Sequence, residues 1–494
     1  MNKELRKIIS DEIHRRHGYR FMESKIKPVH IANALMRIEH QCVGRMVVLE
    51  QLFEATLNRN TIDKRVEAVQ TLLESQRERW GRLGESEDLR SSVLMTKVLP
   101  LIRTLLGADG AAFGSSPEWS SFSSPTALTI TTDASDDGAG SFVHRLWTGS
   151  NDGDRLEILD LLNQLTAPEK DPSQLDDLSA LLVPLVEGTK KKAAPLWGAE
   201  DISTKYSTIE FSLRDAARDL AAYELKLKPN PIATLQRVVL LAALSIFRHA
   251  STRSLERYDS PERILLLDAT GDRYSNVADA SVRCVAQLIS DARTYISDLL
   301  RDLLRAQNTN WHENPINALN GLMETNGHAP VDPKNKIIEK LQEILIETDP
   351  HDIERELAEE IVKSVEGTSG RGLDGYLRLL GVRSGLLYPQ QKTLNKRLVP
   401  TDRTLEVLVA SSIDVNAAPL EYKDFLEVLR YRWSIVVGGI STDNALLVQI
   451  GAHVPPRELT ENSERFLSRL ESIGLARRLA DSVAVVGLLE DNYE

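Results

Sequence analysis

The chain contains little cysteine and no long apolar run. Its 494 residues include 2 cysteines, Cys42 and Cys284, which stand far apart. A zinc-thiolate cluster or a disulfide framework needs several cysteines, so this count excludes both and favours a reducing compartment. The longest uninterrupted apolar run, Val238 to Phe247, is too short to span a membrane. The charged N-terminus has no signal-peptide core, so we expect a cytoplasmic protein with no membrane partner.

Positive charge is also in deficit. The 60 Lys and Arg residues face 72 Asp and Glu residues, which gives a net charge of −12. An acidic chain is poorly suited to coating nucleic acid, although a local basic patch is compatible with this total. No Gly-x-x-x-x-Gly-Lys-Ser/Thr loop is present, so we do not expect ATP hydrolysis. We expect no cofactor. We also expect no bound metal, because the N-terminal histidines lack an accompanying carboxylate motif and are expected at the surface. They are His14, His17, His30 and His40.

Most of the chain shows the periodicity of amphipathic helices, with apolar residues three and four positions apart. A strand is predicted from Ile264 to Asp268, and Lys190 to Lys192 is expected to lie in a loop. We therefore predict a mainly α, multi-domain protein with a few short strands. The expected helices cover residues 2–17, 30–58, 62–83, 92–106, 154–165, 211–225, 231–248, 276–305, 334–348 and 352–365.

Two polar connections rich in Gly, Ser, Asn or Pro, residues 108–126 and 308–333, indicate domain boundaries. They lead to four predicted domains. In chain order these are an N-terminal helical bundle (1–107), a middle helical domain with a β-hairpin insertion (108–307), a helical domain with a basic stretch (308–415) and a winged-helix domain (416–494).

The last part of the chain has the element order of a winged helix-turn-helix. Helices are expected at Glu421 to Trp433, at Thr442 to Ile450, and from a cap at Thr460 up to Gly474. Two apolar runs joined by a polar turn at Asp481-Ser482 follow, and this pattern is typical of a hairpin, here the wing.

A module of this kind binds DNA or protein. If it binds DNA, its third helix would present Arg465, Ser468 and Arg469 to the major groove, and its wing would offer Arg477 and Arg478 to phosphates. Residues 420–494 contain 8 Lys and Arg against 12 Asp and Glu. Because phosphate neutralisation dominates DNA affinity, this balance favours contact with protein.

The stretch from residue 371 to residue 403 reverses the sign of the charge. Only Asp374 and Asp402 oppose its basic residues, and Tyr376 and Tyr388 lie among them. It predicts a contact with a nucleic-acid backbone or with an acidic partner. The alternative is pairing with the acidic helix just before it, which carries Glu354, Glu356, Glu359 and Glu360. The basic residues are Arg371, Arg378, Arg383, Lys392, Lys396, Arg397 and Arg403.

The motif Thr-Asp-Ala-Ser-Asp-Asp-Gly-Ala-Gly at residues 132–140 resembles the first hairpin of retroelement-type RNase H domains, over about fifteen residues. The resemblance implies a magnesium-dependent nuclease in which Asp133 is the first metal ligand. Glu157 and Asp268 are the further carboxylates that this sequence offers, although Asp268 follows Asp133 at a greater distance than is usual in the family. The alternative is a plain β-hairpin with a solvated acidic turn. The strand that ends in Asp268-Ala-Thr-Gly-Asp could also serve a nucleotide phosphate or a magnesium ion.

Residues 380–390 (LGVRSGLLYPQ), residues 402–409 (DRTLEVLV) and the tail that follows resemble accessory proteins of multi-gene bacterial anti-phage defence operons, over about the last 120 residues. The resemblance implies a non-enzymatic adaptor whose partners are other subunits of a DNA-directed defence complex, an ATPase or a nuclease. Double-stranded DNA is a second candidate partner. A transcriptional regulator that uses the winged helix alone is a further alternative.

Overall fold

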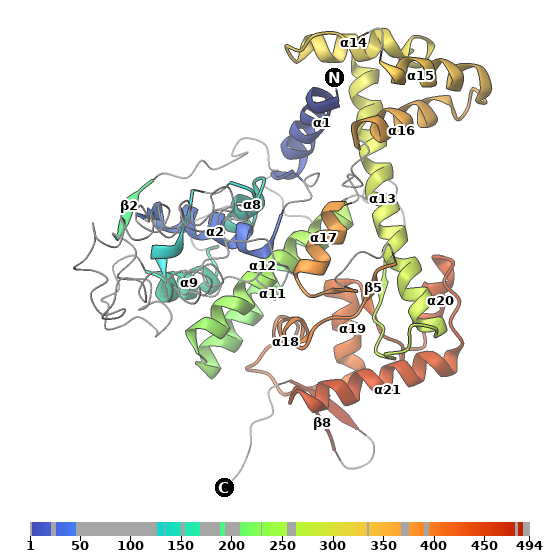
Figure 1. The fold of residues 1–494 in the computed structure, drawn as a ribbon. Helices are drawn as coiled ribbons and strands as arrows, with labels where there is room; N and C mark the ends of the chain where they lie inside the picture. Colours follow the sequence, from blue (N-terminus) through green and yellow to red (C-terminus); the bar gives the residue numbers. More distant parts are fainter. Residues whose placement is uncertain are drawn as a thin grey trace, which may run out of the picture.

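The computed structural model describes residues 2–20, 26–45, 126–132, 134–149, 154–167, 188–192, 208–228, 230–253, 263–332, 335–366, 375–389, 395–479 and 483–487. Within these ranges helices predominate and the strands are short, which confirms the predicted mainly α class (Figure 1). Outside the described residues lie the predicted helices 62–83 and 92–106, most of the connection 108–126, and the candidate residues Asp133, Arg371 and Lys392.

The N-terminal segment forms α1 (Asn2–His17), as expected, and α2 (Pro28–His40). Pro28 lies at the first turn of α2, where its missing N–H costs nothing. The prediction that this helix continues to residue 58 is wrong. Gln41 takes a left-handed conformation (φ 50°) and ends the helix, and β1 (Cys42–Gly44) follows. β1 pairs antiparallel with β2 (Thr189–Lys191), so Lys190 and Lys191 lie in a strand and not in a loop.

The prediction of a β-hairpin around the acidic motif is also wrong. A 3₁₀ turn, η3 (Ala127–Thr129), precedes residues 130–132, which form no strand, and the second part of the motif begins a helix, α8 (Ala139–Thr148). Asp136 Oδ2 accepts a 3.0 Å hydrogen bond from Gly140 N at the start of α8. A Cβ atom at Gly140 would lie 2.8 Å from the carbonyl oxygen of Ile31. The small residues of the motif therefore let α8 pack closely on α2.

Four further helices build the centre of the fold: α9 (Glu157–Thr166), α11 (Thr208–Leu227), α12 (Pro231–Arg253) and α13 (Asn276–Gln307). α12 packs against α2, α8, α9 and α11 (Figure 1). Its segment Pro231–Thr252 is long and apolar enough to cross a membrane, which the uninterrupted apolar run did not indicate. The neighbouring helices cover it, and 78% of its apolar window is buried inside the protein.

The C-terminal half of α13 carries an arm that projects from the rest of the molecule (Figure 1). The arm consists of η7 (Trp311–Glu313), α14 (Pro315–Thr325), α15 (Lys336–Glu347) and α16 (Ile353–Glu366). α15 and α16 confirm the predicted helical pair. Residues 308–333 were expected to form an irregular connection, but they contain α14. Its start is fixed by Asn314, whose Oδ1 accepts a hydrogen bond from Asn317 N.

The chain then forms α17 (Gly375–Arg383) and α18 (Asp402–Ala410), with the antiparallel strands β4 (Leu387–Tyr388) and β5 (Arg397–Leu398) between them. The C-terminal module, residues 420–487, follows. It contains β6 (Leu420–Glu421), α19 (Tyr422–Trp433), β7 (Ile435–Val436), α20 (Asp443–Gln449), α21 (Pro456–Ser472), β8 (Ala476–Arg478) and β9 (Ala484–Val486).

Three helices followed by a hairpin match the predicted order in this module. β6, β9 and β8 form one antiparallel sheet in that order. The third helix, α21, begins at Pro456 and not at Thr460. Thr460 does not cap it, because its hydroxyl donates to the carbonyl oxygen of Pro456. Pro456 sits at the first helical position, which proline tolerates.

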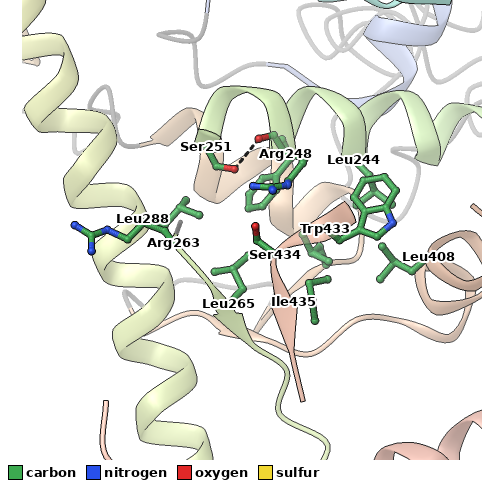
Figure 2. A pocket seen from close by; sticks show the side chains of 12 residues that line it. Leu244, Arg248, Ser251, Arg263, Leu265, Leu288, Leu408, Trp433, Ser434 and Ile435 are labelled. Carbon is green, nitrogen blue, oxygen red and sulfur yellow. Dashed lines mark hydrogen bonds between the residues drawn. The ribbon is translucent and has the colours of Figure 1, made fainter. Parts of the chain in front are cut away.

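The C-terminal module shares a core with the central helices. β7 pairs in parallel with β3 (Leu265–Leu266), and Leu267 makes a parallel bridge to Leu398. Figure 2 shows Trp433, Ser434 and Ile435 beside α12 and β3, around a hollow of about 10 Å³. A hollow of this size holds at most about one water molecule, so the junction is closely packed. Arg248 of α12 also donates to the carbonyl oxygen of Arg432.

Candidate functional site

The helix expected to enter a DNA groove, α21, is anchored to the body of the protein. Its inner face buries Phe466, Leu467 and Leu470. Asn462 on the same face has no exposed surface, and its Nδ2 donates to the carbonyl oxygens of Leu267 (2.7 Å) and Val437 (2.8 Å). Its Oδ1 accepts from Ala269 N at 2.8 Å. One buried amide therefore joins α21 to the ends of β3 and β7.

Three of the four arginines predicted to touch DNA are bonded within the chain. Arg465 donates to the carbonyl oxygen of Thr270 at 2.6 Å. Arg469 donates to the carbonyl oxygen of Pro400 and to Asp402, both at 2.7 Å. Arg478 pairs with Glu464 at 3.0 Å and with Glu471 at 3.1 Å. The hydrogen bonds that Arg478 donates to Glu464 and Glu471 raise its pKa.

The remaining residues of this predicted site lie at the surface. Ser468 is exposed on α21, close in helical spacing to the exposed Glu461 and Glu464. Arg477 is exposed in β8 and makes no side-chain hydrogen bond or ion pair with another residue that the structure describes. At the tip of the hairpin Leu479 and Val483 are 42% and 40% exposed. Leu479 N donates to the carbonyl oxygen of Val483 at 2.7 Å, which sets these two residues opposite one another.

The basic stretch does not form one continuous surface. Arg383 donates to the carbonyl oxygen of Ile26 at 2.5 Å, and burial lowers its pKa. Lys396 is buried and donates to the carbonyl oxygen of Pro389; burial first, and then Arg378, lower its pKa. Tyr376 is completely buried. Of the site residues that the structure describes in this stretch, Arg403 is exposed and Arg397 is largely buried.

The alternative, in which this stretch pairs with the preceding acidic helix, does not apply to the pairs that the structure describes. Glu354 pairs with Arg305 and His312, and Glu360 pairs with Lys340 and Lys363. The other two glutamates also have partners nearby. Glu356 accepts from Thr348, and Glu359 faces Arg355.

The carboxylates proposed for a nuclease lie in different places. Asp268 is 1% exposed, and both of its oxygens are engaged. Oδ1 accepts from Thr270 N (2.9 Å) and Thr270 Oγ1 (2.6 Å), and Oδ2 accepts from Arg397 Nη1 at 2.5 Å. Glu157 is exposed at the start of α9 and lines another cleft, with Arg155 and Asp219. The described part of the chain holds no group of three His, Cys, Asp or Glu residues placed to bind a metal.

The histidines expected at the surface include buried ones. His17 and His30 are 9% and 3% exposed. His17 Nε2 lies 2.5 Å from the hydroxyl of Tyr295 on α13. Tyr19, just after α1, lies close to His249 of α12, with 2.7 Å between its hydroxyl and His249 Nδ1. These hydrogen bonds attach the N-terminal segment to the central helices, a structural role that helical spacing alone did not indicate.

Both cysteines are buried and unbridged. Burial raises the pKa of the Cys42 thiol, and it raises that of Cys284 to about 11. A thiol with a raised pKa carries little thiolate at neutral pH, so neither cysteine is suited to act as a nucleophile.

A cleft of about 750 Å³ opens beside Asp268, where β3 ends and α13 begins. The sequence singled out the Asp-Ala-Thr-Gly-Asp loop and, separately, Tyr388 and Arg397 of the basic stretch, but it did not indicate that they lie together or that Arg273, Asp279 and Asn395 join them. Two arginine–tyrosine contacts lie here. The guanidinium carbon of Arg397 is 5.9 Å from the centre of the Tyr388 ring, and that of Arg273 is 4.5 Å from the centre of the Tyr274 ring. The lining side chains include Arg273, Asp279, Tyr388, Asn395 and Arg397.

Comparison of the chain with models of protein families, with curated proteins and with solved structures finds no match.

Proposed function

We propose that the chain is a non-enzymatic adaptor, and that its C-terminal module is a winged helix that binds a protein partner. The observation that carries the proposal is the use of Arg465, Arg469 and Arg478 inside the chain. A DNA-binding module keeps such side chains available for phosphates. Here a phosphate contact would first require the loss of these internal contacts, and exposed ion pairs such as Arg478–Glu464 are each worth about 0–1 kcal/mol.

The charge of the exposed surfaces supports a protein partner. The outer side of α21 carries Glu461 and Glu464 beside Ser468. The arm from residue 308 to residue 366 contains 13 Asp and Glu against 5 Lys and Arg. Negative charge repels phosphates but complements a basic protein surface, which it also attracts over long range.

The hairpin tip is the candidate contact of the module. Leu479 and Val483 are exposed side by side at its end, with Arg477 exposed on the same strand as Arg478. We assign to this tip a partner with an apolar surface patch that covers Leu479 and Val483. The resemblance of the tail to defence-operon accessory proteins supports an ATPase or nuclease subunit as that partner.

The DNA alternative is tested with purified protein and a random fluorescent duplex, at about 50 mM and about 200 mM salt. We expect no salt-sensitive rise in anisotropy, and we expect the variant R465A/R469A/R477A/R478A to behave like the wild type. Binding at low salt that the four substitutions abolish would make the module a DNA reader and would overturn the proposal.

The protein contact is tested by co-expression with the products of adjacent genes. We expect a stable complex with one of them, and we expect the double variant Leu479→Asp/Val483→Asp to lose it. The matched control is Leu225→Asp/Leu227→Asp, because these leucines are also exposed (42% and 45%) but lie on α11. A complex that survives the hairpin substitutions, or the lack of any complex, would contradict the assignment.

A further inference from the structure

The cleft beside Asp268 lies where α/β proteins commonly hold a ligand. Ligands bind outside the carboxyl ends of parallel strands. β3 pairs in parallel with β7, and Leu267, the residue after β3, forms a parallel bridge with Leu398. Asp268 follows directly, at the carboxyl end of β3. The volume of the cleft, about 750 Å³, falls within the range of roughly 300–1,000 Å³ typical of small-molecule sites.

The structure distinguishes between the two ligands that the sequence left open, a magnesium ion and a phosphate. Magnesium binds through free carboxylate oxygens. Both oxygens of Asp268 are taken by Thr270 and Arg397, and the bond to Arg397 neutralises the carboxylate. Arg273 remains exposed at the cleft. Arginine binds phosphate oxygens in a bidentate manner. Besides Asp268, Asp279 is the one carboxylate among the described lining residues, and no group of three potential metal ligands lies among the residues described. The cleft therefore suits an anion better than a cation.

The other lining groups match the remaining parts of a nucleotide. Tyr388 is 49% exposed and lines the cleft, so one part of its ring is open to stacking with a base. Asp279 and Asn395 are exposed at the cleft and can accept hydrogen bonds from ribose hydroxyl groups.

We propose that this cleft binds a mononucleotide, with Tyr388 against the base, Asp279 on the ribose and Arg273 on the phosphate. The chain has no phosphate loop of the Gly-x-x-x-x-Gly-Lys-Ser/Thr kind, so the proposal is binding without hydrolysis. It goes beyond the adaptor function, and it stands on residues that the hairpin contact does not use. The co-expression experiment and the one below can therefore fail independently.

The test is isothermal titration of the full chain with ATP, GTP and AMP in a buffer that contains EDTA. We expect one site with a micromolar dissociation constant for at least one of the three nucleotides. Adenosine, guanosine and inorganic phosphate, titrated separately, are expected to bind at least about tenfold more weakly, because each supplies only part of the contacts. The absence of heat for all three nucleotides up to about 1 mM would overturn the proposal.

Two exposed variants locate the site. Arg273→Ala and Tyr388→Ala are each expected to weaken nucleotide binding about tenfold, the usual size of a lost charged or stacking contact. The controls are Arg457→Ala and Tyr431→Ala, since these side chains are exposed on the C-terminal module (90% and 66%). Equal weakening in the controls, or phosphate binding as tight as nucleotide binding, would each contradict the assignment.

Discussion

Arg397 Nη1 lies 2.5 Å from Asp268 Oδ2. The two residues are 129 positions apart in the sequence, and the side chain of Asp268 is almost completely buried. Their ion pair joins the end of β3 to the start of β5. It also makes Asp268 an internal partner of Arg397, although the sequence had suggested a metal ligand.

Removing the arginine of this pair should destabilise the protein strongly. Arg397→Ala leaves a buried carboxylate without its counter-charge, which costs about 3–5 kcal/mol. Urea unfolding followed by tryptophan fluorescence measures the loss, and Arg397→Ala/Asp268→Asn should restore part of it. Arg403→Ala is the control, because Arg403 is exposed and its loss should change the free energy of unfolding by less than about 0.5 kcal/mol. Equal effects of the two arginine substitutions would disprove this role.

Asn462 should be the side chain that fixes α21 most firmly. Asn462→Ala leaves the backbone groups of Leu267, Val437 and Ala269 without their partner. Each unsatisfied buried group costs about 1–3 kcal/mol, so we expect a loss of about 3 kcal/mol. Hydrogen exchange should show faster opening of α21 in this variant. Ser468→Ala on the exposed side of the same helix should leave the exchange rates unchanged, and similar rates in both variants would count against the anchor.

Two glycines of the C-terminal module allow a matched comparison. Both have positive φ, +101° at Gly438 and +77° at Gly474. A Cβ atom at Gly438 would lie 2.4 Å from the carbonyl oxygen of Leu459, whereas nothing lies within 4 Å at Gly474. Gly474→Ala should therefore cost about 1–2 kcal/mol for its backbone conformation alone. Gly438→Ala should cost at least about 1 kcal/mol more, for the displacement of α21. Thermal unfolding of the two variants measures the difference, and equal midpoints would contradict the close approach.

Glu39 should make stability fall at acid pH. Burial raises its pKa, but hydrogen bonds from His144, Arg155 and Asn163 outweigh burial and lower the pKa from 4.5 to about 2. The unfolded chain therefore binds the proton more readily, so this stabilisation is complete above pH 4.5 and is lost as the pH falls toward 2. The shift corresponds to at most about 3 kcal/mol.

The Glu39 contribution is measured as the free energy of unfolding between pH 5 and pH 2, for the wild type and for Glu39→Gln. The glutamine variant lacks this titration, so its stability should decline less steeply over the same range. Parallel curves for the two proteins would show that Glu39 does not contribute to acid sensitivity.

Local patterns predicted many of the elements. The apolar spacing that predicted helices at 2–17, 211–225 and 276–305 corresponds to α1, α11 and α13. The two apolar runs predicted to form a hairpin correspond to β8 and β9, and the predicted turn at Asp481-Ser482 lies outside the described residues. Such patterns are reliable because the apolar face of a helix or of a strand is formed by residues that lie close together in the sequence. The winged-helix assignment of the module remains a prediction based on this order.

The wrong predictions share a cause. Residues 129–146 have the composition of a strand and an acidic turn, but Asp136 accepts a hydrogen bond from the first turn of a helix there, and Gly140 lets that helix pack against α2. Gln41 ends α2 through a left-handed conformation that no glycine or proline signalled. In both places, packing against a segment distant in sequence determines the backbone conformation, because burial against that segment outweighs the local preference for helix or strand.

The sequence by itself determined the helical class, the order of the C-terminal elements and the acidic balance, since all three depend on residue types and short spacings. Only the tertiary structure decided what the charged side chains do. Arg465, Arg469 and Arg397 had the appearance of a binding surface, and the fold bonds them to Thr270, Asp402 and Asp268. Contacts between residues far apart in sequence arise only when packing brings their elements together. The need for a partner is strongest for Arg397 and Asp268, because burial removes the water that would otherwise solvate their charges.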